Sequence, residues 1–350
     1  MNRLENAYGL KEVQLPADLE GKPACRIGRV LSQEKGLYRI VTDAGEHRAE
    51  VSGKFHFRAE TAADYPAVGD YVAAQDNPGG NAIIQAVLPR KSVFLRKAAG
   101  TGNQEQVVAA NVDTVFLCMS LNQDFNLRRL ERYLAVAWES GAAPVIVLTK
   151  TDLCPDREGF LAQVEGVAMG ADIVFTSSAE AQGYQSLLPY LLPGKTIAAM
   201  GSSGVGKSTL INHLLGEARL ETNGLRNDDK GRHTTTHREL FLLNNGAMVI
   251  DTPGMRELGL WDAGEGLSHS FADIEELAAR CRFRDCTHSG EPNCAIAQAL
   301  QDGTLSPHRW ASYQKLQKEN SFSQDSGGYL VQKKKKFKDI AKLSRKISKG

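Results

Sequence analysis

The sequence predicts a multi-domain α/β protein, and three observations support this prediction. Short segments rich in β-branched and aromatic residues fill residues 24–90 and are separated by turn residues. From about residue 112 to about residue 262, apolar strand-like runs alternate with helical stretches, which is typical of a mostly parallel sheet. The remaining residues are helical and loop-like, with three cysteines clustered among them. A chain of 350 residues is long enough for two or three domains.

The first predicted domain is a small β-barrel. Five short strands in about 70 residues fit an OB-fold, although an SH3-like barrel would give a similar pattern. The strands are expected in the segments ACRIGRVLSQ, GLYRIVTDAG, HRAEVSGKFHF, GDYVAAQ and NAIIQAVLPR. Among the aromatic residues Tyr38, Phe55, His56 and Phe57, we expect most to fill the barrel core, with stacking on nucleic-acid bases as the alternative.

The second predicted domain begins with the apolar run VDTVFLCMSL, as expected for a strand buried on both faces of a parallel sheet. A helix follows in LRRLERYLAVAWES and ends at Gly141. Further strands are expected in PVIVLT, DIVF, TIAAM, ELFLL and AMVID. The predicted organisation is an extension at 1–20, an OB-fold at 21–91, the α/β domain at 92–262, a helical metal-binding domain at 263–330 and a basic tail at 331–350.

A phosphate-binding loop is predicted at 201–209, where GSSGVGKST matches the pattern G-x-x-x-x-G-K-[ST]. An apolar strand precedes it and a helix follows, and therefore backbone N–H groups and a helix N-terminus would surround the phosphates. We expect Lys207 to reach the β- and γ-phosphates and Ser208 to hold Mg²⁺. In the later motif DTPG, Asp251 is expected to hold Mg²⁺ through water, and Gly254 to donate its N–H to the γ-phosphate.

The base would be recognised by the motif TKTD at 149–152. Lys150 can lay its alkyl stem over a purine, and Asp152 can accept two hydrogen bonds from the N–H and NH₂ groups of guanine. Adenine lacks this edge and would leave the carboxylate unpaired, which is costly. The segment TSSA at 176–179 would lie near the guanine O6, and we therefore expect GTP to be preferred over ATP.

The order of these motifs is unusual. In a typical GTPase the phosphate loop comes first and the guanine-reading strands come last, whereas here TKTD and TSSA precede the phosphate loop. Because chain termini often lie close together, the same sheet can form from a circularly permuted chain. The predicted GTP-binding residues are Thr149, Lys150, Thr151, Asp152, Ser177, Ser178, Ala179, Gly201, Ser202, Ser203, Gly204, Val205, Gly206, Lys207, Ser208, Thr209, Asp251 and Gly254.

A metal site is predicted in the segment CRFRDCTHSGEPNC. It brings Cys281, Cys286, His288 and Cys294 within 14 residues. Three thiolates and one imidazole suit one tetrahedral, structural Zn²⁺ ion per chain, and four protein ligands leave no open position for catalysis. The alternative is a helical region with unligated cysteines.

The basic end of the chain predicts a polyanionic partner. Residues 333–350 carry nine Lys/Arg and one Asp, a charge of +8, and since the whole chain has +1 the remainder sums to −7. Phe337, Ile340, Leu343 and Ile347 fall at helical spacing, which indicates an amphipathic helix. Nucleic acid or an anionic membrane could receive it, and a solvated tail is the alternative.

Cellular location and oligomeric state follow from weaker signals. No apolar run approaches the roughly 20 residues that span a bilayer. The first residues lack an apolar secretory core, and a cytoplasmic location is therefore expected. The sequence carries no signal for an oligomer, and a monomer is expected.

With its permuted motifs and cysteine cluster, the sequence resembles the RsgA family of GTPases that depend on the small ribosomal subunit, also called YjeQ or EngC. The resemblance covers almost the whole chain and implies an N-terminal OB-fold, a permuted GTPase domain and a C-terminal zinc domain. It further implies late maturation of the small subunit, contacts with ribosomal RNA, no membrane partner, and hydrolysis of GTP to GDP and phosphate that the subunit stimulates.

One position departs from typical GTPases. Met255 follows DTPG, where Ras-like enzymes carry a glutamine that orients the attacking water, and methionine has no donor for this role. We expect His233 to orient the water and one of Thr234, Thr235 or Thr236 to contact Mg²⁺. His233 could instead bind RNA or cap a turn. A GTP-dependent RNA-binding switch with incidental hydrolysis is therefore the alternative function, whereas a metabolite kinase is disfavoured because TKTD selects guanine.

Overall fold

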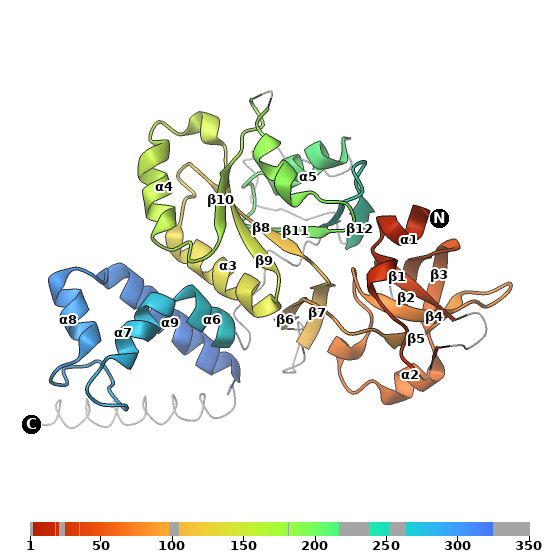
Figure 1. The fold of residues 1–350 in the computed structure, drawn as a ribbon, viewed down its shortest axis with the longest axis horizontal. Helices are drawn as coiled ribbons and strands as arrows, with labels where there is room; N and C mark the ends of the chain where they lie inside the picture. Colours follow the sequence, from red (N-terminus) through yellow and green to blue (C-terminus); the bar gives the residue numbers. More distant parts are fainter. Residues whose placement is uncertain are drawn as a thin grey trace, which may run out of the picture. The chain divides into compact units, whose positions relative to one another are not determined.

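The structure is a computed structural model in which the chain divides into two compact units, Met1–Gly259 and Leu260–Gly350 (Figure 1). None of the helices in the described ranges is both long and apolar enough to span a membrane. The structure describes residues 3–17, 19–20, 25–34, 36–97, 105–180, 182–216, 238–251 and 264–324.

Five strands form the N-terminal barrel, and they are β1 (Cys25–Glu34), β2 (Leu37–Thr42), β3 (Gly45–Val51), β4 (Tyr71–Gln75) and β5 (Ala82–Val87). Strand β1 pairs with both β2 and β4, which closes the ring, and β3 pairs with β5 in parallel. A register shift between Val30 and Ser32 lets the long strand β1 bend between its two partners. The predicted OB-fold is confirmed, and apolar residues from all five strands fill its interior.

The third predicted strand was too long. It was expected to continue through Phe57, but β3 ends at Val51 and a short helix, α2, occupies Gly53–Arg58. The side chain of Ser52 accepts a hydrogen bond from the backbone N–H of Phe55 at 3.1 Å. This N-cap begins the helix directly after the strand and prevents the alternating pattern from continuing.

The barrel aromatic residues divide between core and surface. Tyr38 is 3% exposed, and the partly buried Phe55 packs against the same core. His56 is exposed and contacts the Tyr65 hydroxyl through Nδ1 at 3.0 Å. Phe57 is 92% exposed. The expectation of core positions is therefore wrong for His56 and Phe57.

The α/β part contains five parallel strands in the order β10 (Asp172–Phe175), β9 (Ala143–Thr149), β8 (Thr114–Ser120), β11 (Thr196–Met200) and β13 (Met248–Asp251). Helix α3 (Leu127–Ser140) packs on β8 and β9. Helix α5 (Lys207–Leu215) and the 3₁₀ helix η4 (Gln185–Tyr190) share a buried apolar cluster with the central strands. Helix α4 (Arg157–Glu165) and the 3₁₀ helix η3 (Thr151–Leu153) lie between β9 and β10 along the chain.

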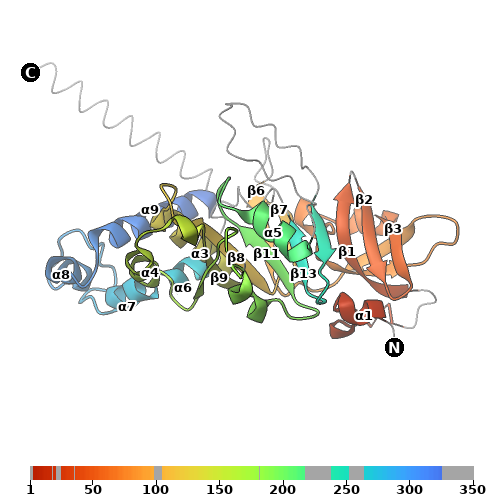
Figure 2. The ribbon, with the colours of Figure 1, turned by 90° about the horizontal axis from the view of Figure 1, so that it is seen from above.

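The barrel and the parallel strands belong to one sheet. Strand β12 (Glu239–Leu242) runs antiparallel to β13 on one side and to β1 of the barrel on the other. The result is an eleven-stranded sheet that continues from β10 through β13 and β12 into the barrel, which can be followed in Figure 2. A separate hairpin of β6 (Val93–Lys97) and β7 (Glu105–Ala110) was not predicted.

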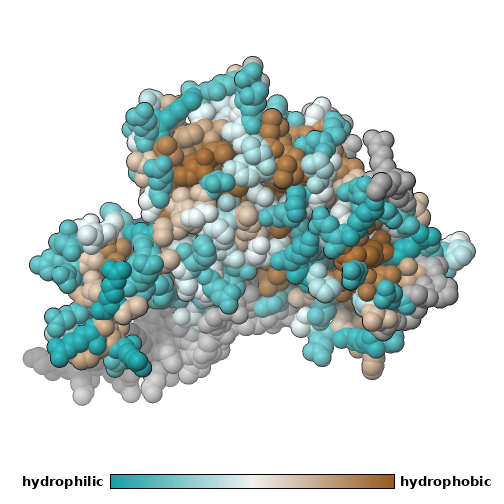
Figure 3. Space-filling view, in the orientation of Figure 1, coloured by the Kyte–Doolittle hydropathy of each residue, from teal (hydrophilic) through white to brown (hydrophobic). Residues whose placement is uncertain are grey.

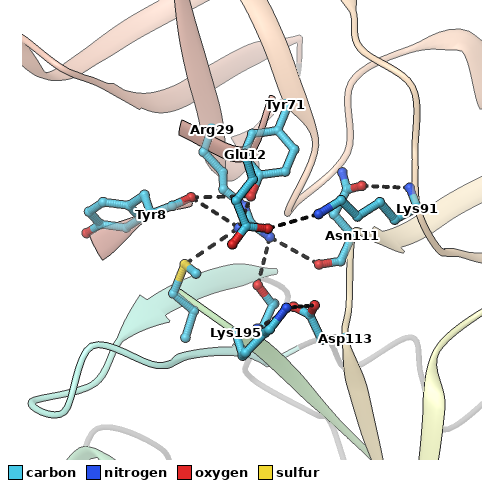
Figure 4. A network of polar contacts seen from close by, with 10 residues as sticks. Tyr8, Glu12, Arg29, Tyr71, Lys91, Asn111, Asp113 and Lys195 are labelled. Atoms are coloured by element: carbon cyan, nitrogen blue, oxygen red, sulfur yellow. Dashed lines mark hydrogen bonds and ion pairs between the residues drawn. The ribbon is translucent and has the colours of Figure 1, made fainter. Parts of the chain in front are cut away.

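A buried arginine joins the barrel to its surroundings within the first unit (Figure 4). Arg29 of β1 donates to the Tyr71 hydroxyl at 2.7 Å and to the Tyr8 carbonyl at 3.2 Å. Its other terminal nitrogen donates to the Asn111 carbonyl at 3.1 Å and to Thr196 Oγ1 at 2.8 Å. Arg29 therefore connects the N-terminal extension, the barrel and the first residue of β11.

The N-terminal extension forms helix α1 (Arg3–Ala7) and a 3₁₀ turn, η1 (Leu10–Glu12), with Tyr8 and Leu10 buried. A second 3₁₀ turn, η2 (Ala62–Asp64), precedes β4.

The described part of the second unit consists of four helices and the non-helical segment that carries the cysteine cluster. Phe271 packs against Tyr313 in its core, with ring centroids 5.4 Å apart. Arg309 forms two hydrogen bonds of 2.7 Å with the carboxylate of Asp273. The helices of this unit are α6 (Gly264–Ser270), α7 (Ala272–Ala279), α8 (Ala295–Asp302) and α9 (Pro307–Gln324).

Candidate nucleotide and metal sites

Each predicted nucleotide motif begins where a parallel strand ends. TKTD ends β9, TSSA follows β10, the phosphate loop follows β11 and Asp251 ends β13. Because these strands are parallel neighbours, their carboxyl ends lie along one edge of the sheet. Ligands of open α/β sheets bind at this edge.

The backbone of the predicted phosphate loop adopts conformations that require glycine. Gly204 and Gly206 have positive φ angles of 75° and 103°, which few other residues adopt. At Gly201, a Cβ atom would lie 2.5 Å from the Cys118 carbonyl oxygen, and only glycine fits there. Lys207, 8% exposed at the start of α5, donates to the carbonyl of Gly201 at 2.7 Å and to that of Ser202. Its ammonium group therefore lies across the loop.

The TKTD motif, which is predicted to read guanine, is held in a tight turn. Lys150 has a left-handed backbone with φ of 57°, which turns the chain sharply after β9. The carboxylate of Asp152 accepts a hydrogen bond of 2.5 Å from the hydroxyl of Ser177, a residue only 1% exposed. The same hydroxyl accepts from the backbone N–H of Ala179 at 3.1 Å. TKTD and TSSA thus form one hydrogen-bonded unit.

One hydrogen bond connects this unit to the phosphate loop. The Thr149 hydroxyl donates to the carbonyl of Val205 at 2.7 Å, across 56 positions of sequence. Thr149 is buried, and Val205 is 1% exposed. The base-reading motif and the phosphate loop are therefore in direct contact, although their order in the chain is reversed.

A further residue at this edge was missed by the sequence analysis. Asp124, in the loop after β8, accepts hydrogen bonds from the Ser202 hydroxyl at 2.6 Å and from Arg129 Nη1 at 2.9 Å. Burial would raise the pKa of Asp124, but the hydrogen bonds from Ser202 and Arg129 lower it overall. The signal that could have found it is the polar stretch Asn122–Asn126, which follows a buried strand at the same edge.

Of the remaining residues predicted for the nucleotide site, some lie in the described part of the chain and others do not. Ser208 and Thr209 lie in the first turn of α5, and half-buried Asp251 is the last residue of β13. Five predicted residues lie outside the described part of the chain, and these are His233, Thr234, Thr235, Thr236 and Gly254.

An open depression elsewhere in the first unit does not suit phosphates. It has a volume of about 610 Å³, lies between α4 and β10, and is lined by Leu161, Met169, Ile173 and Phe175 among others. Figure 3 shows apolar surface over this part of the molecule. Its lining includes the acidic residues Glu165 and Asp172 but no cation.

The four predicted metal ligands come together in the second unit. Their ligand atoms all lie within 4.8 Å of one another. His288 Nδ1 lies 3.4 Å from Cys294 Sγ and 3.6 Å from Cys281 Sγ, and the two sulfurs are 4.0 Å apart. Ligands of a tetrahedral zinc ion are separated by about 3.8 Å when each bond is about 2.3 Å, and the Cys₃His set therefore fits such an ion.

The local backbone explains how a short segment forms this cluster. His288 has a left-handed φ of 59°, which turns the chain back after Cys286. Cys294 begins α8 as its N-cap, and its sulfur accepts from the backbone N–H of Ala297 at 3.4 Å. Trp310 of α9 meets the His288 ring edge-on, with centroids 5.6 Å apart.

Comparisons with known proteins agree with this geometry. A family model described as RsgA GTPase matches residues 87–261. A Lactiplantibacillus plantarum protein named small ribosomal subunit biogenesis GTPase RsgA 2 is 48% identical over 328 residues, which cover 93% of this chain and 92% of that protein. The Opitutus terrae protein named small ribosomal subunit biogenesis GTPase RsgA is 50% identical over 306 residues, with coverages of 84% and 83%.

Two solved structures share the fold. YjeQ from Thermotoga maritima aligns with a TM-score of 0.62 and 28% identity, covering 83% of this chain and 97% of that one. YloQ, described as a circularly permuted GTPase, aligns with a TM-score of 0.62 and 26% identity, covering 88% and 98%. The predicted permutation is confirmed, and the chain belongs to the RsgA GTPase family.

Proposed function

We propose that this GTPase of ribosome biogenesis binds the small ribosomal subunit during its late maturation and hydrolyses GTP to GDP and phosphate when the subunit activates it. The hydrogen bond between Thr149 and Val205 is the observation that carries the nucleotide part, because it joins a guanine reader to a phosphate loop. The names of the curated relatives support the ribosomal part.

Each end of GTP has its own residues in this proposal. Asp152 accepts the two donors of the guanine edge, and the Lys150 stem covers the ring. Loop amides and Lys207 bind the phosphates, while Ser208 and Asp251 hold the Mg²⁺ ion that neutralises developing charge. The metal of the Cys₃His cluster is proposed to be structural zinc, since its four ligands leave no open position.

The attacking water needs a separate group because Met255 offers no donor. We assign this role to His233, with Thr234, Thr235 or Thr236 contacting Mg²⁺. Single-turnover hydrolysis by His233→Ala, measured with saturating small subunits, should be slower while GTP and subunit binding are retained. An unchanged rate would remove His233 from the mechanism.

The proposed domains have separate roles. Residues 92–262 bind and hydrolyse GTP, the barrel at 21–91 and the basic tail at 331–350 contact the subunit and its ribosomal RNA, and the region at 263–330 holds the structural zinc. The exposed Phe57 supports a role of the barrel in base stacking. We propose a cytoplasmic monomer.

The test is a GTPase assay in which purified small subunits are titrated. A saturable rise in the hydrolysis rate is expected, with none from large subunits as the matched control. A flat response would favour the alternative, a GTP-dependent RNA-binding switch with incidental hydrolysis.

The basic tail gives a second test of subunit binding. Deleting residues 331–350 should weaken binding and flatten the dependence of log Kd on log salt, because fewer phosphate contacts release fewer counterions. Equal binding across the salt series would contradict an RNA contact by the tail.

A further inference from the structure

A row of charged residues crosses the sheet from the barrel to the proposed Mg²⁺ site. Pairs of directly opposite residues link Arg48 to Arg39, Arg39 to Ser32, Ser32 to Glu239, and Glu239 to Asp251. These five residues belong to β3, β2, β1, β12 and β13, and we call them the charged row. Because opposite residues on paired strands point to the same side, the row lies on one face.

In the middle of the charged row, an ion pair between β2 and β12 crosses over the strand β1 that lies between them. Arg39 pairs with the carboxylate of Glu239, although β1 lies between their strands. Two strand spacings separate them by about 10 Å, which an arginine can cover only above a small neighbour. Ser32 is that neighbour. Arg39 also lies 3.6 Å from the carboxylate of Glu46, which helps hold its guanidinium.

The far end of the row places two carboxylates side by side. Glu239 and Asp251 are opposite residues, whose Cβ atoms are typically about 4.5–5.5 Å apart, and like charges at this distance repel. Arg39 is the row's cation that pairs with Glu239. It therefore draws the first carboxylate toward the barrel and away from the second.

We propose that Arg39 is a positioning residue for the Mg²⁺ site, which acts by holding Glu239 away from Asp251. The inference rests on the proposed function, in which Asp251 holds the Mg²⁺ of bound GTP. A residue of the barrel thereby contributes to the geometry of the nucleotide site, and polyanions that bind near Arg39 would alter it.

The test compares Arg39→Ala, Glu239→Gln and the double variant in the full-length protein. The readouts are the Mg²⁺ concentration that half-saturates binding of a non-hydrolysable GTP analogue and the one that half-saturates single-turnover GTP hydrolysis. Arg39→Ala should lower both concentrations by about three- to fivefold, the size expected of one cross-strand charge pair, because the freed Glu239 adds a second carboxylate beside Asp251. Glu239→Gln should stay near wild type, and in the double variant it should cancel the effect of Arg39→Ala because no second carboxylate remains beside Asp251.

Arg48→Ala is the matched control, since it removes a neighbouring cation of the same row that lies opposite Arg39 rather than Glu239, and it should leave the Mg²⁺ dependence unchanged. Thermal unfolding of each variant separates misfolding from displacement. An unchanged or raised Mg²⁺ requirement in Arg39→Ala, an equal change in Arg48→Ala, or a double variant that keeps the Arg39→Ala value would each overturn the inference. Wild-type protein without Mg²⁺-dependent hydrolysis would instead refute the proposed function.

Discussion

At the scale of single residues, Asp152 is the group we expect to select guanine. Asp152→Asn replaces one acceptor oxygen with an NH₂ group that opposes the donors of the base. Losing charge-assisted hydrogen bonds of this kind costs about 3 kcal/mol, and GTP affinity should therefore fall by about a hundredfold while ATP affinity stays low. Calorimetric titration with both nucleotides measures this change.

Ser177→Ala is the graded control for Asp152. Its hydroxyl orients the carboxylate through the 2.5 Å hydrogen bond and also accepts from the Ala179 N–H, and the loss of GTP affinity should be about tenfold or less. GTP binding by Asp152→Asn at the wild-type level would show that the base is read elsewhere.

The sequence indicates candidate residues for the nucleotide site but not their mutual contacts. Lys207 and Asp152 were identifiable because their motifs have fixed spacing and direct chemical roles. The contact of Thr149 with Val205 and that of Asp124 with Ser202 join segments 56 and 78 positions apart. Such contacts depend on which strands become neighbours, and no local pattern encodes that choice.

At the scale of secondary-structure elements, metal bound by the Cys₃His cluster should stabilise the helices next to it. We expect one equivalent of zinc, and its removal by a chelator should reduce the helical circular dichroism signal. Cys294 is both a predicted ligand and the N-cap of α8, and the helix would therefore lose support at its start. Metal analysis and circular dichroism, before and after chelation, measure the effect.

Cys286→Ser and Cys154→Ser form a matched pair for this prediction. The first removes a predicted ligand and should lower the zinc content, whereas Cys154 lies in the first unit, outside the cluster, and should have no effect. Purified protein with less than about half an equivalent of zinc would count against the site.

Element boundaries were predictable where one local signal dominated. The strands of the parallel sheet are mostly apolar runs, and their positions follow from the sequence. Helix α2 was read as a strand because Phe55 and Phe57 alternate with polar residues, while the capping hydroxyl of Ser52 decides the outcome. The hairpin of β6 and β7 was missed, and it stands apart from the main sheet.

At the scale of the whole molecule, the permuted order of motifs was predictable, but the joining of the barrel to the parallel sheet was not. The order of the motifs can be read directly from the amino-acid sequence. The pairing of Ser32 with Glu239 links segments about 200 positions apart at the edges of two sheets. Edge strands can pair with many partners, and their side chains alone do not specify which one.

The buried Arg29 should make the barrel and the α/β part unfold together. Its guanidinium donates hydrogen bonds to the carbonyls of Tyr8 and Asn111 and to two hydroxyl groups (Figure 4). Burial lowers the pKa of this guanidinium. Arg29→Met keeps much of the apolar volume but removes these buried hydrogen bonds, and the Tyr8 carbonyl keeps only the Tyr71 hydroxyl, 3.4 Å away. The free energy of unfolding should fall by about 3 kcal/mol or more, measured by urea denaturation.

Arg26→Met, in the same strand, is the control for this prediction. Arg26 pairs with Asp43 and Asp76 at partly exposed positions, where ion pairs contribute less than about 1 kcal/mol. Hydrogen exchange should give β2 of the barrel and β8 of the parallel sheet similar opening free energies in the wild type, and different ones in Arg29→Met. Equal unfolding free energies for Arg29→Met and Arg26→Met would mean that the backbone pairing of β1 with β12 suffices to join the two parts.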